Sequence, residues 1–149
     1  WMERIKNLRE EKDLAQKDLA NILGIDRSTY SSYEIGRDTI PLKHLNTLCN
    51  YFDISIDYAM GLTKTTKYKN SSDEINMEKV SERLKNIRKE NNLTQAHISE
   101  ILNTSRSTWT GYEGKKFLIS TLLLYEVSRR YNYSMDYILG KIDKPSKLK

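Results

Sequence analysis

The sequence has little cysteine, histidine, proline or glycine: one Cys, two His, two Pro and six Gly in 149 residues. A single cysteine cannot form an intramolecular disulfide, and Cys49 falls in an apolar helical stripe, which favours a buried hydrophobic role. His44 and His97 are the only histidines. There is no glycine-rich phosphate loop, no metal-spaced Cys/His set and no nucleophile motif. We therefore expect no enzyme activity, no metal and no cofactor.

Long hydrophobic runs are also missing. No apolar stretch approaches the roughly 18 residues of a membrane span, and no charged and then apolar leader opens the chain. Hydrophobic residues make up 38% and charged residues 30% of the sequence, a composition typical of globular proteins. These features predict a cytoplasmic protein without membrane contact, and the length allows one domain or two small ones.

Positive charge is concentrated toward the C-terminus. Residues 1–61 hold eight Lys/Arg against ten Asp/Glu, residues 62–76 three against two, and residues 77–149 fourteen against eight. The three segments therefore carry −2, +1 and +6 within a net charge of +5. A basic surplus of this size is compatible with nucleic-acid binding, but it also fits an ordinary solvated surface.

The sequence repeats itself at a constant offset of 79 residues. Three matched pairs carry the repeat: RIKNLREEKDLAQ (4–16) over RLKNIRKENNLTQ (83–95), RSTYSSYE (27–34) over RSTWTGYE (106–113), and SIDYAMG (55–61) over SMDYILG (134–140). A repeat of this length is a small domain and not a solenoid unit, because solenoid periods are about 20 to 50 residues. The chain therefore contains two copies of one folding unit.

Each copy is predicted to form five short helices. Apolar residues recur at spacings of three and four with no alternating strand pattern, so the expected fold is all-α. Ser55 is a suitable N-cap and Gly61 a suitable stop for the fifth helix of the first copy. The predicted organisation is a first domain at 1–61, a linker at 62–76, a second domain at 77–140 and a basic tail at 141–149.

The expected linker, LTKTTKYKNSSDEIN, is polar and without periodicity. Fully extended, its fifteen residues reach at most about 50 Å, and as a flexible coil they average roughly 21 Å. These lengths bracket the roughly 34 Å between DNA half-sites one turn apart. A flexible linker of this kind would allow one chain to reach two half-sites.

Residues 14–36 (LAQKDLANILGIDRSTYSSYEIG) resemble the Cro and phage-repressor helix-turn-helix family, also called XRE-like, and so do residues 93–116. The resemblance includes a Gln that starts the second helix, a small residue four positions later, a turn, a Ser/Thr-rich third helix and a closing Glu. It implies two tandem lambda-repressor-like DNA-binding domains and a transcriptional regulator, a repressor in particular, with double-stranded DNA as its partner.

Helical spacing gives the third helix of each copy two faces. Tyr30, Tyr33 and Glu34 share one face, whereas short hydroxyls and an arginine share the other. Such a polar face can enter the major groove, where Arg can bind guanine O6 and N7. The predicted base-reading residues are Arg27, Ser28 and Ser32 in the first copy and Arg106, Ser107 and Thr110 in the second.

The resemblance also implies phosphate contacts and a structural ion pair. Free N–H groups at the start of the second helix favour an anion there. The predicted phosphate-binding residues are Gln16, Lys17, Arg37, Gln95, Lys115 and Lys116. The predicted ion pairs are Arg9 with Glu34 and Arg88 with Glu113, and their expected role is to hold the first helix to the end of the third.

The second copy departs from the family pattern at three places. Asn103 replaces the turn glycine Gly24, which Asn tolerates because it adopts left-handed backbone conformations more readily than most residues. Gly111 replaces a base-reading side chain and costs the helix up to about 1 kcal/mol. The loop Gly114–Phe117 moves its glycine by one position. Base reading by the second copy is therefore expected to lack one contact.

A second class of function remains open. One copy would bind DNA while the other forms a dimerisation or partner surface, as in an antitoxin or the target of an anti-repressor. The net negative charge of residues 1–61 favours this interpretation. A homodimer and a protein anti-repressor are the corresponding expected partners.

Overall fold

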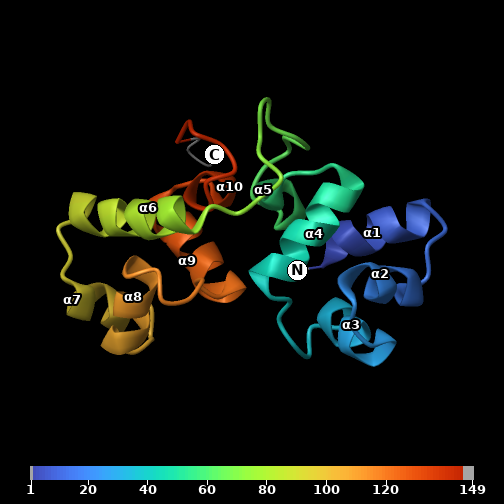
Figure 1. The fold of residues 1–149 in the computed structure, drawn as a ribbon, viewed down its shortest axis with the longest axis horizontal. Helices are drawn as coiled ribbons and strands as arrows, with labels where there is room; N and C mark the ends of the chain where they lie inside the picture. Colours follow the sequence, from blue (N-terminus) through green and yellow to red (C-terminus); the bar gives the residue numbers. More distant parts are fainter. Residues whose placement is uncertain (1, 146–149) are drawn as a thin grey trace. The chain divides into compact units, whose positions relative to one another are not determined.

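The structure is a computed structural model and describes residues 2–145 of the chain. These residues form α-helices and no strand, which confirms the predicted all-α class (Figure 1). The helices, in order, are α1 (Glu3–Glu11), α2 (Gln16–Leu23), α3 (Arg27–Glu34), α4 (Leu42–Phe52), α5 (Ile56–Ala59), α6 (Met77–Glu90), α7 (Gln95–Ile101), α8 (Arg106–Glu113), α9 (Thr121–Tyr131) and α10 (Met135–Ile138).

The chain divides into two compact units between Asp73 and Glu74. We call the part with α1 to α5 unit 1 and the part with α6 to α10 unit 2. The two predicted five-helix copies are thus present in tandem. Within the described residues, no helix combines the length and the apolar character that a membrane span needs.

Short polar side chains start several of these helices. Ser55 Oγ accepts a hydrogen bond from Tyr58 N at 2.9 Å, and Ser134 Oγ accepts one from Tyr137 N at 3.1 Å. Thr94 caps α7 by accepting from His97 N at 3.0 Å. Ala15, its counterpart before α2, has no side-chain cap bond. The helix α2 therefore lacks the side-chain cap that its counterpart α7 has, and such a cap is usually worth about 1 kcal/mol.

The turn between the second and third helix has the same left-handed backbone in both units. Gly24 has φ 68° and Asn103 has φ 55°. Glycine adopts this conformation without strain, and asparagine tolerates it better than most residues. The replacement of Gly24 by Asn103 therefore leaves the turn intact, as expected.

Each unit has its own hydrophobic core. Side chains from several helices are fully buried: Ile5, Leu19, Tyr30, Leu45, Leu48 and Ile56 in unit 1, and Leu84, Ile87, Ile98, Trp109, Ile119 and Leu124 in unit 2. The second and third helices pack against each other in both units. This packing fixes the third helix with one face in the core and the other toward solvent.

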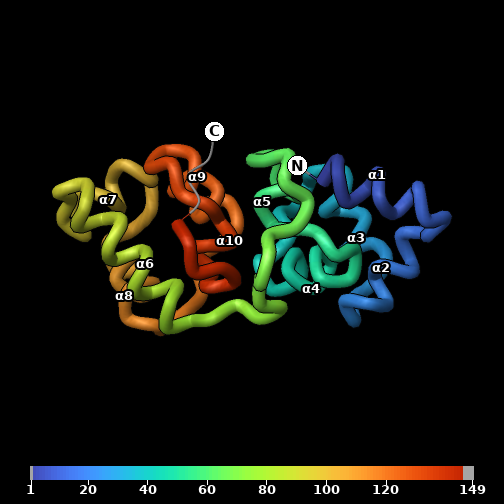
Figure 2. Tube along the Cα trace, turned by 90° about the horizontal axis from the view of Figure 1, so that it is seen from above, coloured from blue at the N-terminus to red at the C-terminus, as the bar shows by residue number. Residues whose placement is uncertain are grey.

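Residues 62–73 differ from the flexible linker that the sequence predicts. Ser55 N donates to the carbonyl of Thr66 at 2.6 Å, and Tyr68 Oη donates to the buried carboxylate of Asp57 at 2.7 Å. Asn46 and Asn50 on α4 both donate to the carbonyl of Asp73, at 2.9 and 2.7 Å. Figure 2 shows this segment following unit 1 before the chain continues to α6. Hydrogen bonds to backbone carbonyls hold it there, and such bonds leave no periodic pattern in a sequence.

A repeated arginine holds the chain after the last helix of each unit. Arg4 Nη1 donates to the carbonyl of Thr63 at 2.8 Å, and Arg83 Nη1 donates to that of Ile142 at 2.8 Å. The two guanidinium groups also lie 4.2 and 4.1 Å from the ring centroids of Tyr58 and Tyr137. The first residues of the predicted basic tail are therefore packed on unit 2, while 146–149 lie outside the described residues.

Candidate nucleic-acid interface

The third helix of unit 1 has an apolar and a polar face. Tyr30 and Tyr33 are 0% and 8% exposed, and their rings meet edge to face at 6.3 Å. Arg27, Ser28 and Thr29 are exposed on the opposite side. The start of α3 therefore presents one long basic donor and two short hydroxyls to solvent.

Ser32 does not belong to this exposed surface. It is 4% exposed, and its hydroxyl donates to the carbonyl of Thr29 at 2.6 Å. The carbonyl of Ser32 accepts hydrogen bonds from the backbone N–H groups of Arg37 and Asp38, at 2.9 and 3.2 Å. The loop that follows α3 thus folds back over this residue. The expectation that Ser32 reads bases is corrected, because its side chain is buried and its hydroxyl is bound to the backbone of α3.

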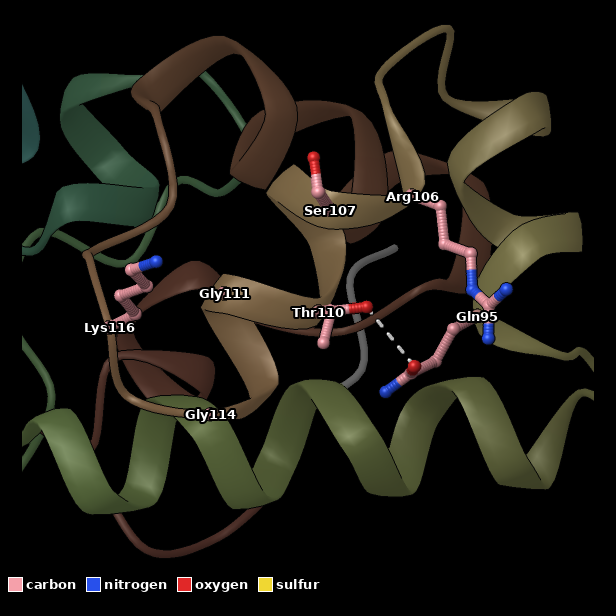
Figure 3. A pocket seen from close by; sticks show the side chains of 7 residues that line it. All are labelled: Gln95, Arg106, Ser107, Thr110, Gly111, Gly114 and Lys116. Carbon is pink, nitrogen blue, oxygen red and sulfur yellow. Dashed lines mark hydrogen bonds between the residues drawn. The ribbon is translucent and has the colours of Figure 1, made fainter.

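The third helix of unit 2 repeats the same division. Trp109 and Tyr112 are 0% and 5% exposed, while Arg106, Ser107 and Thr110 are exposed. These three exposed residues line an open hollow of about 630 Å³. Gln95, Gly111, Gly114 and Lys116 complete its lining (Figure 3). The hollow joins the start of α7, the polar face of α8 and the loop after it.

Gly111 is buried by Phe117, which follows it in the loop after α8. A Cβ atom at position 111 would lie 2.3 Å from Phe117 Cζ and 2.5 Å from Cε2. Any side chain at this position would displace the ring. Position 111 is therefore not an open gap in the polar face, as the sequence suggested, because an aromatic ring from the loop covers it.

Both halves of the chain match models of known protein families. Residues 5–58 match a family model described as "Helix-turn-helix", and residues 81–144 match one described as "Helix-turn-helix domain". Together the two matches cover most of the chain. The chain belongs to the helix-turn-helix family. Its helix-turn-helix elements are α2 with α3 and α7 with α8, and α3 and α8 occupy the position of the recognition helix in this motif.

Several curated proteins resemble about one helix-turn-helix unit of the chain. An uncharacterized HTH-type transcriptional regulator of Bacillus subtilis, YobD, is 36% identical over 63 residues, 42% of this chain and 56% of its own length. The cryptic phage CTXphi transcriptional repressor RstR of Vibrio cholerae is 34% identical over 53 residues, 36% of this chain and 48% of its own. The antitoxin PezA of Streptococcus pneumoniae is 37% identical over 51 residues, 34% of this chain and 32% of its own. The chain thus spans about half the length, or less, of these relatives. No solved structure matches it significantly.

A buried ion pair ties the end of each recognition helix to the first helix of its unit. Arg9 Nε lies 2.8 Å from Glu34 Oε2, with side chains 10% and 2% exposed. Arg88 and Glu113 repeat the pair at 2.6 Å. Each arginine also donates to a backbone carbonyl before the second helix, that of Leu14 or Leu93, at 2.8 Å. The structure thus brings together the residues predicted as ion pairs, and their position gives them a structural role.

The glutamines at the start of the second helices belong to the same networks. Gln16 Nε2 donates to Glu34 Oε1 at 3.0 Å, and Gln95 Nε2 donates to Glu113 Oε1 at 3.1 Å. Gln95 also accepts a hydrogen bond from Thr110 Oγ1 at 3.1 Å (Figure 3). Both glutamines are half-buried. The structure therefore gives each of them a bridging role between the two helices, in addition to the predicted phosphate contact.

The environment of Glu34 keeps its carboxylate ionised. Burial alone raises the pKa of Glu34, but hydrogen bonds from Arg9, Tyr30 and Gln16 outweigh burial and hold the pKa below its ordinary value of 4.5. The pKa of Glu113 is lowered in the same way, with Trp109 in the place of Tyr30. Burial and, second to it, the hydrogen bond to Glu34 raise the pKa of the Tyr30 hydroxyl. Both networks therefore require a charged glutamate.

Residues 16–38 hold three Lys/Arg against four Asp/Glu, and the equivalent residues 95–117 hold three against two. Three positions contribute most to this difference. The first helix-turn-helix element carries an exposed carboxylate at each of them, and the second carries none. The pairs are Asp18 and His97, Asp26 and Ser105, and Asp38 and Phe117. Ser105 caps α8 by accepting from Thr108 N at 3.1 Å, whereas Asp26 makes no such bond to α3. The surface around the second recognition helix is therefore the more attractive to phosphate.

The four predicted phosphate-binding cations are all exposed: Lys17, Arg37, Lys115 and Lys116. Lys115 Nζ lies 3.6 Å from Glu78 Oε1, with side chains 54% and 81% exposed. An ion pair as exposed as this one is weak and yields readily to a stronger anion. All four side chains are thus available to a polyanion.

Two features of the site were missed by reasoning from the sequence. The repeated Arg4 and Arg83 are identical residues at the repeat offset, so the register of the two copies was a signal that could have found them. The cover that Phe117 provides over Gly111 had no such signal, because loop geometry determines it.

Proposed function

We propose that the chain is a sequence-specific regulator of transcription that binds double-stranded DNA through α3 and α8. One observation carries the proposal: both recognition helices begin with an exposed Arg–Ser pair, Arg27 with Ser28 and Arg106 with Ser107, on matched scaffolds. Arginine at the start of a recognition helix is suited to guanine, and short hydroxyls allow the helix to approach the base edges. The names of the relatives above support a regulator, and a repressor in particular.

The two units divide the work in this proposal. Unit 1 reads bases through Arg27 and Ser28, and its carboxylates weaken binding to phosphates of any sequence. Unit 2 reads bases through Arg106 and, with Lys115 and Lys116, also supplies most of the electrostatic attraction. Phosphate contacts give affinity for all DNA, whereas base contacts give discrimination of about 1 to 3 kcal/mol for a good bidentate pair.

Selection of bound duplexes from a random pool tests the proposal. We expect enrichment of a sequence with two short half-sites and an affinity that falls steeply as salt rises, because bound cations displace condensed counterions. Failure to enrich any sequence, or binding that does not depend on salt, contradicts it.

A second function rests on the carboxylates of unit 1 and on the likeness to an antitoxin. Here unit 2 alone binds DNA, and unit 1 binds a protein or a second copy of the chain. The selected sequence would then contain a single half-site, and Arg27→Ala would leave DNA binding unchanged while Arg106→Ala abolishes specificity. Light scattering of the full chain measures the homodimer directly, and a partner pulled down by unit 1 would be the anti-repressor. With either function, we propose that the protein acts in the cytoplasm.

A further inference from the structure

Phe117 is a large apolar residue on an otherwise polar surface. Its side chain is 42% exposed, and it directly follows Lys115 and Lys116 in the loop after α8. An exposed phenylalanine alone is ordinary. The position of this one next to the recognition helix gives it significance.

The ring of Phe117 packs against two residues of α8. It lies over the backbone of Gly111, where a Cβ would be 2.3 Å from Cζ, and it meets the ring of Tyr112 edge to face at a centroid distance of 5.7 Å. Unit 1 has Ser32 and Asp38 at the two equivalent positions, so it has no aromatic residue at the position of Phe117. Gly111 and Phe117 therefore form a pair that only unit 2 contains.

The ring's position over Gly111 lies on the face of α8 that the proposed function directs toward DNA. Gly111 follows Ser107 by one helical turn and Thr110 by one residue. All three line the hollow that Arg106 and Lys116 border. The Phe117 ring thus covers position 111 and lies beside the exposed residues Ser107 and Thr110.

In the major groove, the apolar group that distinguishes one base from the others is the 5-methyl group of thymine. We propose that Phe117 determines specificity by packing its exposed ring against a thymine methyl group. The inference rests on the proposed function. It assigns unit 2 a reading contact that is apolar, beside the polar contacts of Arg106 and Ser107.

Replacement of single thymines by uracil in the selected duplex tests this contact, since uracil lacks only the methyl group. With the full-length wild-type chain, we expect one or two replacements in one half-site to weaken binding about fourfold each, as the loss of one buried methyl-sized group implies. Phe117→Ala should weaken binding to thymine DNA by a similar factor and show no further loss with uracil. Phe117→Leu should keep part of the sensitivity.

The variant Gly111→Ser with Phe117→Asp is the matched control, because it rebuilds the residue pair that unit 1 already folds with. It should bind thymine and uracil DNA equally, with thermal melting followed by circular dichroism to show that it is folded. If Phe117→Ala remains as sensitive to uracil as the wild type, or if no thymine in the duplex matters, the ring serves packing alone and the inference is wrong. If the wild-type chain binds no duplex at all, the proposed function itself fails.

Discussion

Lys115 occupies the left-handed backbone position in unit 2 that Gly36 occupies in unit 1. Their φ angles are 60° and 81°. A side chain at this position meets no obstruction, since nothing lies within 4 Å of a Cβ built on Gly36. The cost to Lys115 is therefore one of backbone conformation, about 1 kcal/mol, and the loop keeps a lysine despite it.

Replacing Lys115 by glycine should separate stability from DNA binding. We expect Lys115→Gly to raise the free energy of unfolding by about 1 kcal/mol, because glycine adopts this conformation without strain. The same variant should lower the slope of log affinity against log salt by about one unit, as the loss of one phosphate contact implies. Urea unfolding and a salt titration measure the two effects, and Gly36→Lys is the reciprocal control, expected to destabilise unit 1. An unchanged salt slope would remove Lys115 from the interface.

The buried hydroxyl of Ser128 lowers the stability of unit 2. Ser128 is 0% exposed, and its Oγ has no hydrogen-bond partner in the part of the chain that the structure describes. Its counterpart at the repeat offset is Cys49, also 0% exposed. Ser128→Ala should stabilise the protein by about 1 kcal/mol, because the hydroxyl no longer has to be desolvated. Cys49→Ser should do the opposite, and equal urea midpoints for Ser128→Ala and the wild type would disprove the assignment.

The lowered pKa values of Glu34 and Glu113 predict acid sensitivity. A carboxylate whose pKa is lower in the folded state stabilises the fold fully above its unfolded pKa. This contribution is lost as pH falls below the ordinary value of 4.5 toward the lowered one. We expect Glu34→Gln to be less stable than the wild type at pH 7 but to lose less stability between pH 5 and pH 3. Parallel pH profiles of the two proteins would contradict the prediction.

Truncation of the same residue should be severe. Glu34→Ala leaves Arg9 buried and unpaired, which typically costs about 3 to 5 kcal/mol. We therefore expect loss of the folded state of unit 1 and not a change in DNA specificity, as circular dichroism would show. A folded Glu34→Ala variant with altered specificity would contradict the structural role.

The covalent connection between the two units can be tested by cutting the chain, and the contacts of residues 62–73 with unit 1 determine where the cut should be made. Residues 62–73 are held to unit 1, so a cut between Lys64 and Asn70 would disturb that unit as well as the tether. A protease site inserted between Glu74 and Ile75 avoids the hydrogen bonds of Asp73. Cleavage there should weaken binding to a duplex with two half-sites by about 100-fold or more, since docking of the second unit is no longer intramolecular. Unchanged affinity after complete cleavage would show that tethering has no role.

Much of the fold was predictable because the repeat supplies its own alignment. Helical spacing placed Tyr30 and Tyr33 inside and Arg27 outside, and the structure agrees. Periodicity describes one helix at a time, however. It could not predict that the loop after α3 folds back onto Ser32. Nor could it predict that carbonyl groups of residues 62–73 accept hydrogen bonds from α4 and from Ser55.

The difference between the two units lies in pairs of residues that only the fold brings together. Gly111 alone suggests a missing contact, and Phe117 alone suggests a stray apolar residue. Their contact depends on the path of a four-residue loop, which no residue spacing encodes. The charge difference between Asp26 and Ser105, in contrast, was available from the repeat register.

The most direct test of the account compares Arg27→Ala and Arg106→Ala on the selected duplex and on scrambled DNA over a salt series. If both recognition helices read bases, each variant should lose preference at a different half-site, by about 1 to 3 kcal/mol. Binding to scrambled DNA should change little in either variant. If Arg27→Ala and Arg106→Ala instead weaken binding to both DNAs equally, the two arginines contact only phosphates, and the claim that one chain carries two reading helices is wrong.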